Sequence, residues 1–200
     1  QLPQTATLFF GESVSTGQLL ELARDAKVSM AQAAPDMPDL PAFADKLERS
    51  GRELRLSPPR PPARYSNATL RQEKNFVAAV EALAAALGAL AEALGRVAER
   101  DEGLARCASR AAEACARLER WRDTEAHNLV QWAECYSQSL ALNASPLSIA
   151  EFFKKQVDGR PRAWILTSAT LAVGGDFAHY LEAMGLEGAR TACWDSPFDY

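Results

Sequence analysis

The stretch EKNFVAAVEALAAALGALAEALGRVAER, residues 73–100, decides the fold predicted for this chain. Its large apolar residues recur at alternating steps of four and three, a spacing that places side chains on one face of an α-helix. The residues of this apolar stripe are Phe76, Val80, Leu83, Leu87, Leu90, Leu94 and Val97. We therefore predict an amphipathic helix of roughly 40 Å, at about 1.5 Å per residue, that packs against a partner helix.

A second apolar stripe follows, from Leu104 to Trp121. Asp101 can cap a new helix, and Asp101-Glu102-Gly103 is a natural start signal. One continuous helix and two helices with a break near residues 100–103 both fit this pattern. We prefer two antiparallel helices, over about 73–100 and 102–122, because an uninterrupted helix of that combined length is rare.

Two shorter helices are predicted before this stretch. Residues 15–32 have apolar residues near helical spacing, with Ser15 or Thr16 as the N-cap. Three prolines then break the chain, and residues 41–54 suggest a second helix. The proline-rich segment 57–62 cannot form a helix interior, so it is predicted to be a stiff extended linker.

After residue 128 the pattern changes to the alternation typical of β-strands. We predict a hairpin over residues 129–143, with the turn at Ser137-Gln138-Ser139 and the end at Pro146. Its large apolar residues are expected on one face: Val130, Trp132, Tyr136, Leu140 and Leu142. A short helix is expected around residues 148–156.

The last part of the chain has the composition of an α/β domain. Ala163-Trp164-Ile165-Leu166 is a short apolar run typical of a buried strand in a parallel sheet. Residues 176–184 predict a helix that stops near Gly185, and residues 190–194 suggest one more strand. Two structural regions are implied, one of them discontinuous in sequence.

Composition indicates an ordinary globular protein. The 200 residues are 48% hydrophobic and 24% charged, with a net charge of −4. That charge leaves no global basic footprint for nucleic acid, so any DNA contact must be local, and residues 46–71 are locally basic. We expect no membrane span, because the apolar residues of the longest helix lie on one face. The chain begins without Met and without a signal-peptide pattern, so we expect it to begin inside a longer protein.

The four cysteines do not form a metal-binding pattern. Cys107, Cys115, Cys135 and Cys193 include no C-x-x-C pair, and the chain has two histidines. We interpret them as reduced, largely buried thiols and predict no metal within this sequence.

The chemically most informative residues follow the predicted strand at 163–166. In Thr167-Ser168-Ala169-Thr170-Leu171, three hydroxyls lie at the carboxyl end of that strand, ahead of a glycine pair. Ligands and moving loops meet at this end of open α/β sheets, where hydroxyls can bond carboxylates, imidazoles or phosphates. Helix capping is the alternative role, since Ser and Thr commonly cap the next helix.

Four motifs together resemble one protein family. Thr-Ser-Ala-Thr-Leu after a strand resembles motif III of superfamily 2 helicases, and Ser196-Pro197-Phe198 resembles the segment entering their second motor domain. The opening, with Phe9-Phe10-Gly11-Glu12-Ser13, resembles the stretch after the D-E-A-H box, and Trp132-x-Glu134 adds a match within the hairpin. The sequence resembles DinG-type and YoaA-type ATP-dependent DNA helicases of the XPD-like branch, as an internal fragment from just after the D-E-A-H box through motif III.

This resemblance implies a fold and a division of the chain. Residues 1–125 would be a mainly α-helical, arch-like insert with long antiparallel helices. Residues 126–200 would be the end of the first α/β RecA-like motor domain, with the β-hairpin, the motif III strand and the hinge to the second motor domain. The alternative from a different class is a helical protein–protein interaction module without helicase activity. An exposed apolar stripe would favour that module, whereas a stripe buried against residues 104–121 would favour the arch.

The resemblance also implies which chemistry lies outside this sequence. No G-x-x-x-x-G-K-[ST] occurs, and the D-E-A-H box would lie before Gln1, so ATP and Mg²⁺ would bind in the parent enzyme alone. We expect no catalytic residue and no ATPase activity in this fragment. The cysteines of the family's iron–sulfur cluster would also lie upstream, which leaves a cluster in the parent open.

The resemblance assigns three groups of residues. Thr167, Ser168 and Thr170 would couple the nucleotide state to domain movement, and Ser196, Pro197 and Phe198 would form the hinge. Phosphate contacts with single-stranded DNA would come from arginines of the basic segment, whose contacts do not depend on base sequence. These arginines are Arg52, Arg55, Arg60, Arg64 and Arg71.

The parent would be an ATP-dependent 5′-to-3′ DNA helicase. It would translocate on single-stranded DNA and unwind forked duplexes during repair or replication. The resemblance places such an enzyme in the bacterial cytoplasm, at the nucleoid, without a membrane.

Overall fold

The computed structural model describes residues 11–58, 63–123, 125, 129–146, 150, 154, 163–168 and 171–194. The chain divides into two compact units. The helical unit comprises Gly11–Ser145, and the terminal unit combines Gln1–Phe10 with Pro146–Tyr200. One of the two units is therefore discontinuous in sequence.

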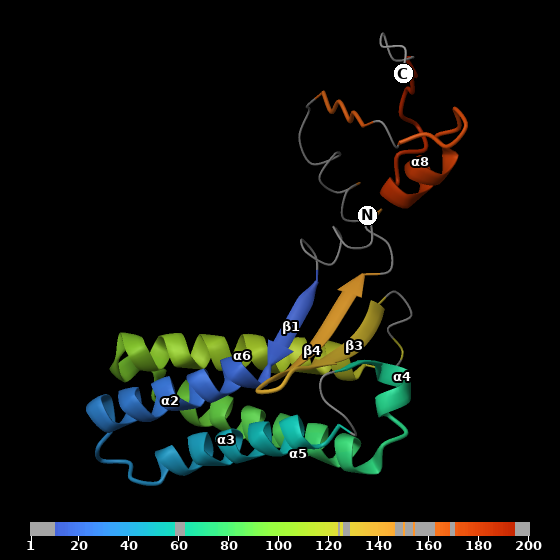
Figure 1. Cartoon of the computed structure of the whole chain (residues 1–200). Coiled ribbons are helices and arrows are strands. Elements are labelled where there is room, and N and C mark those ends of the chain that lie inside the picture. The colour runs from blue at the N-terminus through green and yellow to red at the C-terminus, as the bar shows by residue number, and fades with distance from the viewer. Residues whose placement is uncertain are drawn as a thin grey trace. The chain divides into compact units, whose positions relative to one another are not determined.

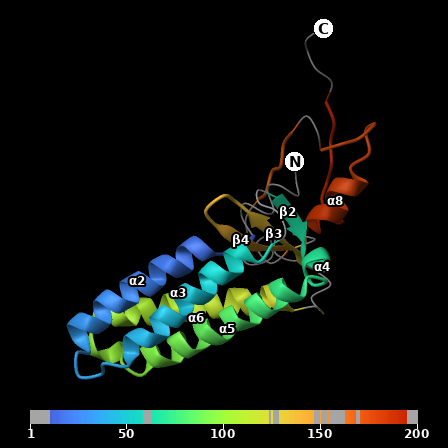
Figure 2. The same cartoon turned by 60° about the horizontal axis from the view of Figure 1, so that its bottom comes forward.

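Four helices form the body of the helical unit (Figure 1). They are α2 (Thr16–Ala33), α3 (Leu40–Leu56), α5 (Lys74–Gly95) and α6 (Glu102–Arg122). Helix α2 packs on α3, α3 on α5, α5 on α6, and α6 returns to α2. Neighbouring helices run in opposite directions, as Figure 2 shows from a second side. The result is a closed antiparallel four-helix bundle, and all four predicted helices are confirmed.

Local capping explains where these helices begin. The backbone N–H of Gln18 donates to Ser15 Oγ at 3.2 Å, and Gln18 Oε1 accepts from the N–H of Ser15 at 3.2 Å, which makes a capping box for α2. Asp101 Oδ2 accepts from the N–H of Gly103 at 2.7 Å and of Leu104 at 3.4 Å. Helix α5 ends at Gly95, so the prediction of two helices with a break is confirmed.

The apolar stripe of residues 73–100 is the centre of the core. Its members are all buried: Phe76, Val80, Leu83, Leu87, Leu90, Leu94 and Val97. Leu104 and Leu118 of α6 are buried against them, and the rings of Phe76 and Trp121 meet edge to face with centroids 6.1 Å apart. The stripe is therefore buried against α6 and does not provide the exposed apolar surface that would favour an interaction module.

Helix α5 is also long and apolar enough to cross a membrane by length and composition alone. Its most apolar window has a mean hydropathy of 1.8. Core helices of soluble proteins meet the same criteria, and the apolar stripe of α5 lies in the core between α3 and α6. We therefore assign α5 to the core.

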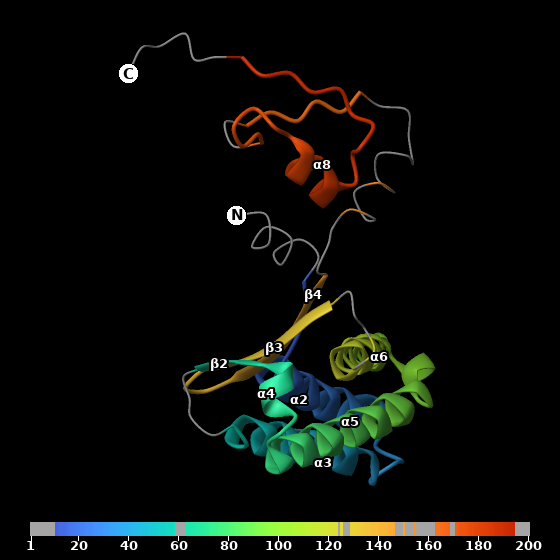
Figure 3. The same ribbon diagram turned by 90° about the vertical axis from the view of Figure 1, so that its right-hand side faces the viewer.

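A four-stranded antiparallel sheet lies at one end of the bundle (Figure 3). The strands are β1 (Glu12–Ser15), β2 (Ala63–Ser66), β3 (Leu129–Cys135) and β4 (Leu140–Pro146), in the order β1-β4-β3-β2. The hairpin of β3 and β4 is confirmed, whereas the two edge strands were not predicted. A short helix, α4 (Asn67–Leu70), follows β2.

One expectation about the faces of the hairpin is wrong. Leu140 and Leu142 join Ala133 and Cys135 in the core beneath the sheet, whereas Val130 and Tyr136 are exposed. The two strands therefore place their large apolar residues on opposite faces of the sheet. Beneath the sheet, the large Leu140 and Leu142 of β4 thus lie beside the smaller Ala133 and Cys135 of β3.

The hairpin also belongs with the helices, which differs from the boundary predicted between residues 125 and 126. Strand β4 pairs with β1, with Glu12 opposite Ala144 and Val14 opposite Leu142. Thr16, the first residue of α2, accepts the N–H of Leu140 on its Oγ1 at 3.0 Å. These contacts join the hairpin to the start of the bundle in one compact unit.

The terminal unit contains α8 (Ala178–Met184), which confirms the helix predicted for residues 176–184. Gly185 ends this helix with a φ of 66°, and the N–H of Leu186 bonds the carbonyl of Leu181 at 2.8 Å. A Cβ at position 185 would lie 2.9 Å from the carbonyl oxygen of Ala150, so glycine is required there for a second reason.

The two strands predicted in the terminal unit are not present. Residues 163–168 and 191–194 have no regular structure, and Ile165 and Trp194 are more than four-fifths exposed. A buried parallel strand needs neighbouring strands and a covered face on each side. The described residues form one sheet, β1 to β4, and none of its strands neighbours these segments. Of the helix expected around residues 148–156, the structure describes residues 150 and 154, and both are helical. Residues 59–62 of the predicted linker lie outside the described residues.

Replacing either of two helix glycines by alanine should have opposite effects on the stability of the chain. A Cβ on Gly103 would lie 2.8 Å from Asp101 Oδ2 and 2.9 Å from Ser29 Oγ, whereas a Cβ on Gly88 would meet nothing within 4 Å. Gly88→Ala should stabilise the chain by up to about 1 kcal/mol through helix propensity. Gly103→Ala should destabilise it instead, because the Asp101 carboxylate that caps α6 and the Ser29 hydroxyl of α2 must move away from the new Cβ. Urea unfolding of both variants measures the difference, and equal stabilisation would contradict the close approach of α2 and α6.

Candidate nucleic-acid interface

The structure separates the arginines that were predicted to contact DNA. Arg52 forms an ion pair with Glu48 one turn earlier on α3. Arg55 and Arg64 lie near the turn of the hairpin. Arg71, which follows α4, contacts the C-terminal end of α6. Arg60 lies outside the described residues. The four described arginines therefore do not form one continuous surface.

Arg71 has a structural role. Its Nη2 donates to the carbonyl of Arg122 at 2.5 Å, and its Nε donates to Asn67 Oδ1 at 3.2 Å. Asn67 in turn donates to Gln131 Oε1 of β3 at 2.7 Å. Arg71 thus bonds a terminal carbonyl of α6 and connects α4, α6 and the sheet.

Arg55 and Arg64 are positioned by the hairpin. Arg55, near the end of α3, donates its Nη1 to the carbonyl of Ser137 in the turn at 3.1 Å. Arg64 lies on the edge strand β2, directly opposite Glu134 of β3. The two guanidinium groups thus come from consecutive elements, α3 and β2, and both contact the same hairpin.

Four side chains form a cluster on the face of the sheet that points away from the bundle. We call Arg64, Trp132, Glu134 and Tyr136 the outer-face cluster. Alternation along β3 places Trp132 and Glu134 on this face, because Ala133 and Cys135 belong to the core on the other. Trp132-x-Glu134 is recognisable in the sequence as a motif of the helicase family. The sequence alone predicts no role for these two residues.

Glu134 is the centre of the outer-face cluster. Its Oε1 accepts from Trp132 Nε1 at 3.2 Å and lies 3.8 Å from Arg64 Nε. Its Oε2 accepts from the Tyr136 hydroxyl at 2.7 Å, and this hydrogen bond, with the nearby carboxylate charge, raises the pKa of Tyr136. The guanidinium carbon of Arg64 lies 4.5 Å from the centroid of a Trp132 ring, within cation–π range. One carboxylate therefore orients two aromatic rings and one arginine.

The members of this cluster differ in exposure. Trp132 is 7% exposed, whereas Tyr136 is 51% exposed and the Arg64 side chain is 63% exposed. Trp132 is therefore a supporting residue, and Tyr136 and Arg64 are the groups that an incoming ligand can reach.

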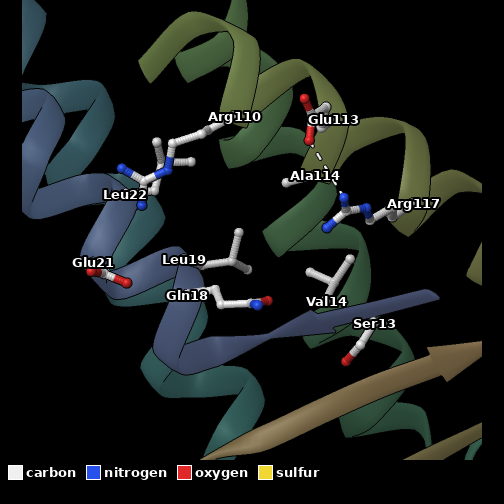
Figure 4. Close-up of a pocket in the computed structure, with 10 residues that line it drawn as sticks. All are labelled: Ser13, Val14, Gln18, Leu19, Glu21, Leu22, Arg110, Glu113, Ala114 and Arg117. Atoms are coloured by element: carbon white, nitrogen blue, oxygen red, sulfur yellow. Dashed lines mark hydrogen bonds and ion pairs between the residues drawn. The ribbon is translucent and has the colours of Figure 1, made fainter. Parts of the chain in front are cut away.

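A groove between β1, α2 and α6 has a different character. Its cavity of about 250 Å³ is lined by Ser13, Gln18, Leu22, Arg110, Glu113 and Arg117 among others (Figure 4). Arg110 pairs with Asp25 at 2.5 Å, and Arg117 lies 3.4 Å from Glu113. Because both arginines face carboxylates, the groove has no excess of positive charge for a phosphate.

The predicted coupling and hinge residues belong to the terminal unit. Thr167 and Ser168 are exposed and lie in a segment without regular structure. Thr170, Ser196, Pro197 and Phe198 lie outside the described residues. Their roles therefore stay predictions.

Cys107 and Cys135 are buried and Cys115 is half-buried, as expected of core residues, whereas Cys193 is exposed. Burial raises the pKa of the Cys107 and Cys135 thiols, and that of half-buried Cys115. The described residues contain no group of three His, Cys, Asp or Glu side chains that could hold a metal ion. The prediction of no metal stays a prediction for the rest of the chain.

Comparison with known proteins shows which class of protein this chain resembles and which individual proteins are similar to it. Over its whole length the chain is similar to ATP-dependent DNA helicases. It is 33% identical over 200 residues to the ATP-dependent DNA helicase YoaA of Escherichia coli K12 and 29% identical over 201 residues to YoaA of Haemophilus influenzae. The predicted resemblance to YoaA-type helicases is confirmed, and the chain spans 31% of the length of each relative. No protein-family profile matches the sequence.

A stability test distinguishes a structural arginine from a surface one. Arg71→Ala removes two hydrogen bonds from a charged donor and should lower the free energy of unfolding by about 1 kcal/mol or more. Arg52→Ala removes a solvent-exposed ion pair within α3 and should cost no more than about 0.5 kcal/mol. Urea denaturation measures both. An Arg71 variant as stable as the Arg52 variant would contradict the structural role.

Proposed function

We propose that this chain is part of an ATP-dependent DNA helicase that moves 5′ to 3′ on single-stranded DNA and unwinds forked duplexes. The observation that carries the proposal is the similarity of the whole chain to two proteins named as ATP-dependent DNA helicases. The complete protein would act in the bacterial cytoplasm, on the nucleoid, in repair or replication. It would bind ATP and Mg²⁺ through residues outside this sequence.

The helical unit would serve as an arch-like insert. Its chain enters at Gly11 and leaves at Ser145, and the strands beside these residues pair, with Glu12 opposite Ala144. A bundle whose two ends lie side by side can be inserted into another domain without separating that domain's segments. This geometry supports an insert, and the terminal unit would then be part of the RecA-like motor domain.

The polarity of unwinding tests this function. The complete protein should separate a duplex with a 5′ single-stranded tail when ATP and Mg²⁺ are present. A duplex with a 3′ tail should remain intact under the same conditions. A gel assay of strand separation, with a non-hydrolysable nucleotide as the control, measures both. Absence of ATP-dependent unwinding on either substrate would contradict the helicase, and unwinding from the 3′ tail alone would contradict its direction.

Ser168 and Thr170 would couple ATP hydrolysis to domain movement. Hydroxyls can exchange hydrogen-bond partners as the nucleotide changes, and each bond to a charged group contributes about 1.5 to 3 kcal/mol, enough to bias a two-state closure. Thr167 would support the same segment, and Ser196, Pro197 and Phe198 would form the hinge.

The coupling role predicts a selective defect in the complete protein. Replacing Ser168 and Thr170 together by Ala should leave single-strand binding nearly unchanged while sharply lowering the base pairs separated per ATP consumed. Thr191→Ala, an exposed hydroxyl of the same unit, is the matched control and should change neither quantity. Unchanged unwinding per ATP in the double variant would mean that these hydroxyls only cap the next segment. Circular dichroism and a melting curve establish that each variant is folded.

A further inference from the structure

We propose that the outer-face cluster is a contact site for single-stranded DNA, in which the Tyr136 ring stacks on a base and Arg64 holds the adjoining phosphate. The choice of ligand rests on the proposed function. The site itself is defined by geometry, namely an exposed aromatic ring and an exposed guanidinium group fixed around one carboxylate.

Tyr136 has the properties of a stacking residue. Half of its surface is exposed, yet its hydroxyl is held by Glu134 at 2.7 Å. A ring fixed at its tip loses little conformational freedom when a base packs on it, so more of the stacking energy contributes to binding. A tyrosine that served only the core would bury its ring, as Phe76 does.

Arg64 has the properties of a phosphate ligand. The Trp132 ring lies 4.5 Å from its guanidinium carbon and Glu134 lies 3.8 Å from its Nε. The ion pair with Glu134 is made through Nε, and no hydrogen bond joins Nη1 or Nη2 to another of the described residues. A guanidinium group oriented in this way presents a planar pair of donors to a phosphate.

The charge around the site favours a polyanion despite Glu134. That carboxylate accepts hydrogen bonds from Trp132 and Tyr136 and is paired with Arg64, so its charge is compensated within the cluster. Arg55 adds a second cation at the turn of the hairpin, where its Nη1 bonds Ser137. The hairpin end therefore combines one half-exposed ring with two arginines, the combination that single-strand binding proteins use.

Binding of a fluorescein-labelled oligothymidylate to the 200-residue chain, followed by anisotropy, tests the proposal. Tyr136→Ala should weaken binding at least about fivefold, which corresponds to the lower end of aromatic–base stacking. Tyr136→Phe keeps the ring but loses the hydrogen bond to Glu134, so it should bind more weakly than the unchanged chain and more tightly than Tyr136→Ala. An unchanged affinity in Tyr136→Ala, or no binding of the oligothymidylate by the unchanged chain, would overturn the proposal.

An abasic oligonucleotide separates stacking from a structural role. Without bases there is nothing to stack, so Tyr136→Ala and the unchanged chain should bind this probe equally. A loss of the same size on both probes would show that the ring only maintains the fold, and the proposal would fail.

Salt dependence tests the phosphate contact. Arg64→Ala should reduce the slope of log affinity against log salt by about 0.7, the contribution of one phosphate on a single strand. Arg106→Ala, an equally exposed arginine near the start of α6, is the matched control and should leave the slope unchanged. Equal slopes for Arg64→Ala and the unchanged chain would remove Arg64 from the site.

Different results would overturn the proposed helicase function and the proposed DNA contact of the outer-face cluster. A complete protein that unwinds DNA while its Tyr136→Ala variant binds normally overturns this contact alone. A chain that binds through Tyr136 within a protein that does not unwind DNA overturns the helicase function alone.

Discussion

Burial of the apolar stripe of α5 is the interaction on which the helical unit depends. The stripe lies against α3 and α6, and Phe76 at its start meets Trp121 at the end of α6. Trp121 also donates its Nε1 to the carbonyl of Trp132 at 3.1 Å, which connects the helical core to β3. A single buried surface therefore stabilises the bundle and orients the sheet. Because the outer-face cluster lies on that sheet, the core also determines where the cluster lies.

Ion pairing limits the positive charge that the helical unit presents to a polyanion. Three arginines of α6 pair with carboxylates on neighbouring elements: Arg110 with Asp25, Arg120 with Glu12, and Arg122 with Glu81. Such exposed pairs stabilise a fold only slightly, but they cancel charge that a polyanion could use. Arg64 differs, because its carboxylate partner is shared with two aromatic donors. A net charge of −4 and a local nucleic-acid contact are therefore compatible in one chain.

The similarity to YoaA and the architecture support each other without being the same observation. The similarity covers every residue of this chain and 31% of each relative. The structure adds that Gly11–Ser145 forms a compact unit with its own core. A unit of this kind can differ in surface chemistry while its core keeps the fold, because the stripe and the caps are buried or local. The DNA contact that we propose accordingly lies on the outer face of the sheet and not in the core of the bundle.

The sequence by itself determined the helices, their caps and the hairpin. Heptad spacing, Asp101 as a cap and alternation after residue 128 all act within a few residues, so local energetics suffice. Only the tertiary structure decided the rest. Strands β1 and β2 have four residues each and form because β4 and β3, distant in sequence, offer backbone partners. The same long-range pairing set which face of β3 is buried, and so brought Arg64 to Glu134. Conversely, residues 163–166 have the apolar pattern of a strand, but a strand needs neighbouring backbone donors and acceptors, and no local pattern supplies them.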